Sequence, residues 1–188
     1  MTARSLPDRI VAIDAALAAD PHAFGGAPAL AYHAEPRATR DIDCNVFVPA
    51  TAAFDVLGPL QALGADVDGA AALAERDGQV RVMWNTTPVD LFFSYDAFHD
   101  AADRDAETVP FAASEIRILS ASHLTVCKVV FDRPRDWVDV DAMLDAAIRD
   151  EDAVEHLGDV LRALVPTVRS IRRIVRTGER ARFEVIEV

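Results

Sequence analysis

The stretch Phe24–Val48, "FGGAPALAYHAEPRATRDIDCNVFV", joins two adjacent glycines to two aspartates that lie one residue apart. Residues 41–48 alternate in character, which predicts a strand whose buried face is formed by Ile42, Cys44, Val46 and Val48. Asp41 and Asp43 then point to the same side of that strand, opposite the buried face. Because neighbouring like charges repel unless a cation lies between them, this pair indicates a cation site.

A third acid follows in a segment that reads as an antiparallel hairpin, with strands over residues 79–84 and 88–93. Its second strand has an apolar face formed by Val89, Leu91 and Phe93. Asp90 lies on the opposite face, so it meets Asp41 and Asp43 if the hairpin pairs beside the strand that carries them. Carboxylate oxygens are the hard ligands that Mg²⁺ (or Mn²⁺) prefers, and three of them suffice for two ions.

The two glycines, Gly25 and Gly26, directly precede an expected short helix that ends near Ala34. Backbone N–H groups at a helix N-terminus bind phosphate oxygens, and a side chain there would block the approach. The following loop, "EPRATR", supplies polar groups suited to a triphosphate: Arg37, Thr39 and Arg40. A glycine pair is also a common turn, and a D-x-D pair is also a common solvated strand face. The order of the motifs therefore carries the interpretation.

This order resembles the nucleotidyltransferase superfamily, in which a G-[GS] turn, a short helix, D-x-[DE] on a strand and a later third acid succeed one another. More closely, "RATRDID" is similar to the AbiEii-type (MenT-like) branch. The looser downstream pattern of that branch is matched by Leu119-Ser120, Leu124, Lys128, Arg133, Arg135-Asp136 and Asp139. The resemblance spans residues 24–144. Gly26 stands where the commoner form of the motif has Ser.

The resemblance implies that a nucleoside triphosphate binds with Mg²⁺ (or Mn²⁺), an acceptor hydroxyl attacks the α-phosphorus and pyrophosphate leaves. Asp41 and Asp43 would hold the metal ions, and Asp90 would complete the second site and help to deprotonate the acceptor. Lys128 would join these acids as a catalytic residue. The nucleotide-binding residues would be Gly25, Gly26, Arg37, Thr39, Arg40 and Asp139.

Lys128 is the only lysine of the chain and lies in an apolar helical segment, "SHLTVCKVVF". A lysine on a buried side needs a partner. Asp136 and Asp139, which share one helix face, are candidates, and the triphosphate is another. The alternative is a structural ion pair between two helices.

The 188 residues, 51% of them apolar, predict an α+β fold: a nucleotidyltransferase-like small mixed or antiparallel sheet flanked by helices, with a helical C-terminal part. We expect a catalytic core over 1–119 and a helical part over 120–188 packed on it. Cys44 and Cys127 lie in apolar segments, which favours a reducing compartment. Without a secretory signal or a membrane-spanning segment, the chain is expected in the cytoplasm.

The net charge of −12 argues against a general nucleic-acid coat protein. Residues 162–182 nevertheless hold seven arginines and one acid. We expect the C-terminal part to be helical to about Arg176, with one basic face formed by Arg169, Arg172, Arg173 and Arg176. That face would follow a nucleic-acid backbone such as a tRNA acceptor stem. The alternatives are surface ion pairs with the acidic body and an interface with an acidic partner.

The leading hypothesis is a Mg²⁺-dependent nucleotidyltransferase. The resemblance suggests RNA, especially tRNA, as the acceptor, while a small molecule such as an aminoglycoside, or a protein side chain, stays open. It also suggests, by analogy, a toxin or phage-defence role with an antitoxin partner. One alternative is a nucleotide- or partner-binding protein that keeps the fold without turnover. Another is a metal-dependent phosphohydrolase that uses the same acids.

Overall fold

The computed structural model describes residues 4–147, 171–177 and 180–186. The chain divides into two units. The first comprises residues 1–28 and 38–119, and the second comprises residues 29–37 and 120–188. Within the described residues, no helix has the length and apolar character needed to cross a membrane.

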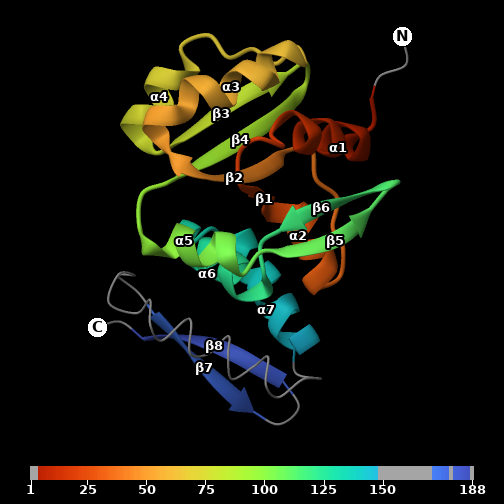
Figure 1. The fold of residues 1–188 in the computed structure, drawn as a ribbon. Coiled ribbons are helices and arrows are strands. Elements are labelled where there is room, and N and C mark those ends of the chain that lie inside the picture. The colour runs from red at the N-terminus through yellow and green to blue at the C-terminus, as the bar shows by residue number, and fades with distance from the viewer. Residues whose placement is uncertain (1–3, 148–170, 178–179, 187–188) are drawn as a thin grey trace. The chain divides into compact units, whose positions relative to one another are not determined.

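The first unit is built on a six-stranded mixed sheet with the order β3-β4-β2-β1-β6-β5 (Figure 1). Its strands are β1 (His22–Phe24), β2 (Ile42–Pro49), β3 (Gln79–Trp84), β4 (Thr87–Ser94), β5 (Glu107–Phe111) and β6 (Ser114–Ile118). β2 is parallel to β4 and β1 is parallel to β6, whereas the other neighbours are antiparallel.

Helices complete the first unit: α1 (Leu6–Ala16), the 3₁₀ turn η1 (Ala50–Ala52), α3 (Ala53–Ala62), α4 (Ala70–Asp77) and α5 (Ala97–Arg104). α1 begins with a capping box, in which the Ser5 hydroxyl accepts from the Asp8 backbone N–H and the Asp8 carboxylate accepts from that of Ser5. The core between helices and sheet is apolar and fully buried, and includes Ile13, Leu17, Phe24, Leu60, Leu91 and Phe93.

The β3–β4 hairpin sets the geometry of the acidic face of the sheet. Its connection has two residues, Asn85 and Thr86, and Asn85 has a left-handed φ of 55°. Short hairpin turns of this kind favour Asn because it tolerates positive φ. The turn fixes the register, in which Arg81 lies directly opposite Asp90. Alternate β3 residues are buried on the helix side: Val80, Val82 and Trp84.

The second unit contains α6 (Ala121–Phe131), α7 (Pro134–Ala147) and a hairpin of β7 (Ile171–Thr177) and β8 (Arg180–Ile186). It also includes the end of α2 (Gly26–His33), a helix that starts in the first unit. The Ser120 hydroxyl caps α6 by accepting from the His123 backbone N–H. α6 ends at Asp132, whose left-handed φ of 49° turns the chain into α7.

The α+β class and the sheet flanked by helices confirm the prediction from the sequence. The expectation of a helix to about Arg176 is wrong, because residues 171–177 form β7. The arginine spacing that suggested a helical face lies in a segment rich in Ile and Val, which favour strands. Arg169 lies outside the described residues.

Candidate active site

Four residues of the first unit form one row across the sheet. Asp43 on β2 is the register partner of Asp90 on β4, and Asp90 in turn faces Arg81 on β3. At the other end of the row, the Gly25 backbone N–H donates to the Asp43 carbonyl oxygen at 2.9 Å. Because neighbouring strands lie about 4.8 Å apart, the two carboxylates of the row are adjacent on one face.

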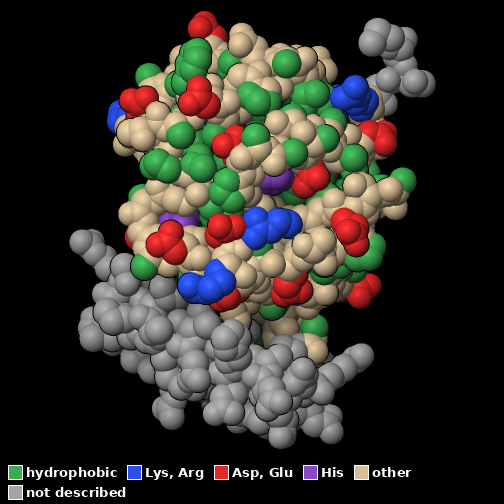
Figure 2. All heavy atoms as spheres, in the orientation of Figure 1, with side chains coloured by type: hydrophobic (Ala, Val, Ile, Leu, Met, Phe, Trp, Pro, Cys, Tyr) green, Lys and Arg blue, Asp and Glu red, His purple; other side chains and the backbone are tan. Residues whose placement is uncertain are grey.

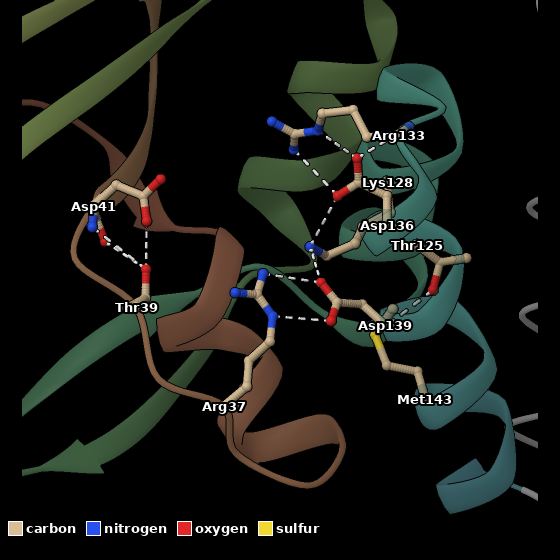
Figure 3. Close-up of polar contacts among 9 residues, drawn as sticks. All are labelled: Arg37, Thr39, Asp41, Thr125, Lys128, Arg133, Asp136, Asp139 and Met143. Carbon is tan, nitrogen blue, oxygen red and sulfur yellow. Dashed lines mark hydrogen bonds and ion pairs between the residues drawn. The ribbon is translucent and has the colours of Figure 1, made fainter.

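Asp41 lies just before β2 and is oriented by a threonine two residues earlier (Figure 3). The Thr39 hydroxyl donates to the Asp41 carboxylate and accepts from the Asp41 backbone N–H at 3.4 Å. Both residues are half-buried. Asp41 and Asp43 have the i, i+2 spacing that places both on the face of β2 opposite its buried apolar residues.

The glycine turn lies against Asp43. Gly26 has a left-handed φ of 52°, and a Cβ built on it would lie 1.8 Å from Asp43 Oδ2. A Cβ on Gly25 would lie 3.1 Å from Asn45 Nδ2 and 3.4 Å from Leu119 Cδ1. Only glycine therefore fits at position 26, where conformation and close approach both exclude a side chain. The Asp43 carboxylate therefore packs directly against the backbone at the start of α2.

Asp90 is held by an arginine that the sequence reading did not single out. Arg81 Nε and Nη2 donate to the two Asp90 oxygens at 2.7 and 2.6 Å. The Asp90 side chain is 15% exposed and that of Arg81 is 58% exposed. The hydrogen bond to Asp90 raises the pKa of Arg81 above its usual value, and the charges of Asp41 and Asp43 add to this effect. The signal that would have found Arg81 is the hairpin register, since a two-residue turn puts it opposite Asp90.

The donor chemistry of this face fits a hard divalent ion. Asp41, Asp43 and Asp90 offer carboxylate oxygens, and the Gly26 backbone lies directly against that of Asp43. In the described part of the chain, however, no three His, Cys, Asp or Glu side chains are gathered as a metal site. Both carboxylate oxygens of Asp90 accept hydrogen bonds from the Arg81 guanidinium.

The second unit holds a buried ionic cluster around Lys128 (Figure 3). Lys128 Nζ donates to Asp139 Oδ2 at 2.6 Å and to Asp136 Oδ1 at 3.4 Å. Arg37 Nε and Nη2 donate to the two Asp139 oxygens at 2.9 and 3.0 Å. Arg133 binds Asp136 with Nε and Nη2 at 2.5 and 3.1 Å. The prediction that Asp136 or Asp139 is the partner of Lys128 is confirmed, since both are.

Burial and pairing act in opposite directions on these two carboxyl groups. Burial disfavours the charged form of Asp136, but the Arg133 hydrogen bonds and the Lys128 charge outweigh it and lower its pKa. Burial likewise opposes ionisation of Asp139, and hydrogen bonds from Arg37 and Lys128 bring its pKa below the usual value. Both aspartates are therefore charged at neutral pH, although they are 1% and 4% exposed.

The predicted site residues are thus divided between the two units. The first unit contains Gly25, Gly26, Thr39, Arg40, Asp41, Asp43 and Asp90, and the second contains Arg37, Lys128 and Asp139. Arg40 is exposed. Cys44 is completely buried and burial raises its pKa, which disfavours the reactive thiolate. On the visible face, acidic and basic side chains of the described residues are interspersed (Figure 2).

Compared by sequence, the chain matches no protein-family model and no curated protein. Compared by structure, it is similar to the solution structure of the antibiotic-resistance factor ANT(2'')-Ia, with a TM-score of 0.62 and 18% identity over 86% of this chain and 93% of that one. It is also similar to the crystal structure of ANT(2'')-Ia in complex with adenylyl-2''-tobramycin, with a TM-score of 0.58 and 17% identity over 85% and 98% of the two chains. The chain therefore has a nucleotidyltransferase fold.

Proposed function

We propose that this protein transfers a nucleoside monophosphate from a nucleoside triphosphate to an acceptor hydroxyl. The observation that carries the proposal is the row in which Asp90 and Asp43 lie side by side and the glycine turn closes on Asp43. Two adjacent strand carboxylates beside a helix that begins with glycine suit a phosphate that is bound through a divalent ion. The fold shared with ANT(2'')-Ia supports the same reaction class.

Asp41, Asp43 and Asp90 are the proposed ligands of Mg²⁺ (or Mn²⁺), which when bound neutralises charge on the triphosphate. The backbone at Gly25 and Gly26 approaches the phosphate oxygens. Asp90 accepts the proton of the acceptor hydroxyl. The acceptor oxygen bonds to the α-phosphorus at the same time, and pyrophosphate leaves. Thr39 fixes the rotamer of Asp41 through its hydroxyl. Catalysis on this face is chiefly positioning and charge neutralisation.

The proposed nucleotide site also includes basic side chains that could bind the triphosphate. Arg40 is exposed and free to bind a triphosphate oxygen as a charged donor. Arg37 and Lys128 both donate to Asp139, so a role for either cation at the triphosphate requires that it exchange Asp139 for a phosphate. We also propose residues 1–119 as the catalytic core and residues 120–188 as the part that selects the acceptor.

We propose a small polycationic hydroxyl compound, of the aminoglycoside type, as the acceptor. The net charge of −12 attracts a cation and repels a polyanion, and a solved structure of the same fold contains adenylyl-2''-tobramycin. tRNA is the competing acceptor. The basic helical face expected for it does not exist over Ile171–Thr177, so RNA binding through Arg172, Arg173 and Arg176 has lost its original support. A toxin role with an antitoxin partner depends on an RNA acceptor.

The proposal is tested with purified protein, Mg²⁺ or Mn²⁺, each of the four α-³²P-labelled nucleoside triphosphates, and either tobramycin or total tRNA. The wild type and Asp55→Asn, which neutralises an exposed carboxylate on α3, should transfer label and release pyrophosphate. Asp43→Asn should lower the rate by about 1000-fold or more, because it removes a charge required at the reacting phosphate.

The competing functions give different results in the same assay. Nucleotide binding without label transfer or pyrophosphate release would identify a non-catalytic binding protein. Formation of free nucleoside monophosphate by attack of water, without an acceptor, would identify a phosphohydrolase. Label on tRNA alone would replace the small-molecule acceptor by RNA and would make an antitoxin partner worth seeking.

A further inference from the structure

We propose that Arg81 is an internal counter-cation that holds Asp90 in the metal-free protein and must release it before the three carboxylates bind a divalent ion. This inference rests on the proposed function, because it concerns the occupancy of the same carboxylates. It assigns to Arg81 a positioning role: Arg81 acts through Asp90 and sets how readily the acidic face binds metal.

The geometry supplies the first argument. β4 lies between β3 and β2, so Asp90 has Arg81 on one side and Asp43 on the other. The Arg81 guanidinium donates through Nε and Nη2 to both Asp90 carboxylate oxygens, at 2.7 and 2.6 Å. A carboxylate held by a bidentate guanidinium has a fixed plane, which here is turned toward β3. Binding of an ion between Asp90 and Asp43 requires that this carboxylate turn toward β2.

The charges supply the second argument. Asp41, Asp43 and Asp90 place three negative charges on one face, where their repulsion destabilises the fold unless a cation offsets it. Arg81 contacts Asp90 of this trio, and its pKa is raised by Asp90 first and by the charges of Asp41 and Asp43 as well. A divalent ion bound to the same carboxylates offsets their repulsion without Arg81. It also repels the positive guanidinium of Arg81. Arg81 and the metal are therefore competitors for Asp90.

The exposure of the two partners supplies the third argument. Asp90 is mostly buried, whereas the Arg81 side chain is 58% exposed. The arginine can therefore swing into water at small cost, while the carboxylate only turns about its own side-chain bonds and stays on the same face of β4. Exchange of one cation for another at Asp90 needs no movement of the backbone.

The test measures Mn²⁺ binding to the full chain from the electron paramagnetic resonance signal of the free ion, with thermal unfolding recorded alongside. Arg81→Gln should bind Mn²⁺ about fivefold more tightly than the wild type, as expected for loss of a competing exposed pair. Without metal, the variant should unfold at a lower temperature than the wild type. Mn²⁺ should raise its unfolding temperature more than it raises that of the wild type.

Two controls separate this role from a general loss of charge or structure. Arg76→Gln removes an arginine that also donates two hydrogen bonds to one carboxylate, that of Asp77 on α4. Because Asp77 is not one of the three proposed ligands, this variant should leave the Mn²⁺ affinity unchanged. Arg81→Lys keeps the charge without the fork and should give an affinity between those of the wild type and Arg81→Gln. In an Asp90→Asn background, Arg81→Gln should no longer tighten Mn²⁺ binding.

Each outcome bears on the inference. Equal or weaker Mn²⁺ binding by Arg81→Gln overturns it, as does the absence of binding by both proteins. Tightening that persists in the Asp90→Asn background also overturns it, because the effect would not act through Asp90. The proposed function fails separately, through absence of nucleotidyl transfer by the wild type. In that case, tighter Mn²⁺ binding by Arg81→Gln would still support the role of Arg81 at Asp90.

Discussion

Gly26 and Asp43 are so close that a methyl group on the glycine would lie 1.8 Å from the Asp43 carboxylate oxygen Oδ2. Non-bonded atoms do not approach so closely, so any side chain at position 26 must displace the carboxylate. Sequence separation hides this relationship, because Gly26 begins α2 and Asp43 lies on β2, after the loop that follows the helix. The glycine pair and the aspartate pair are parts of one local structure.

Gly26→Ala should therefore lower the rate of nucleotidyl transfer by about 100-fold or more, because displacement of a reacting group by about 1 Å has effects of this size. Gly69→Ala is the matched control. Gly69 has a similar left-handed φ of 67°, but a Cβ there meets nothing within 4 Å. It should lose about 1 kcal/mol of stability from strain and keep its activity. Pyrophosphate release and thermal unfolding measure the two effects, and equal activity in both variants would contradict the interpretation.

Thr39→Val should lower the rate of pyrophosphate release by about tenfold, the scale of one lost charge-assisted hydrogen bond. The Asp41 carboxylate would keep its charge but lose the hydroxyl that orients it. Thr39→Ser retains that hydroxyl and should restore the rate. A rate for Thr39→Val equal to that of the wild type, at saturating Mg²⁺, would show that Asp41 needs no such support.

Lys128→Met should lower the free energy of unfolding by about 3 kcal/mol, measured by urea denaturation, because it leaves two buried carboxylates with less compensation. Lys128 Nζ contacts both Asp136 and Asp139. The double variant Lys128→Met/Asp139→Asn should be less destabilised than the sum of the two single changes. Arg76→Gln, which breaks an exposed pair, should unfold at the wild-type urea concentration. Strict additivity would show that Lys128 and Asp139 do not act as a pair.

The same cluster predicts loss of stability in acid. The pKa values of Asp136 and Asp139 lie below their ordinary value of 3.8. The unfolded chain therefore binds more protons near that pH, so the stabilisation is present above about pH 4 and is lost as the pH falls through the folded pKa. Asp139→Asn should be less stable than the wild type at pH 6, and the difference should shrink below pH 4. A constant difference across this range would exclude linkage through Asp139.

Much of the acidic face follows from local patterns in the sequence. Strict alternation over 41–48 predicted β2, and the apolar residues beside Asp90 predicted which side of β4 it occupies. Parallel pairing of β2 with β4 brings Asp43 and Asp90 into register, which meets the condition that the sequence analysis set for their convergence. These features depend on one strand period and one short turn, which sequence encodes directly.

Other features required information that no short stretch contains. The Arg81–Asp90 pair depends on the hairpin register, which changes with a single residue in the turn. β1 has only three residues, too few to show a period. Over 171–177 the helical spacing of the arginines competed with the strand preference of Ile and Val, and pairing with β8 decided the result. Tertiary contacts override local spacing most easily in such short segments.

The pair between Arg37 and Asp139 also has a consequence for synthesis of the chain. The two residues are separated by 102 positions, and Arg37 belongs to a nine-residue stretch grouped with the later part of the chain. At about 5–20 residues per second, a ribosome needs about 5–20 s after Arg37 to add Asp139. During that interval the nascent segment 29–37 lacks its anionic anchor. A nascent chain stopped before Asp139 should therefore expose this segment to protease, and one extended past α7 should protect it.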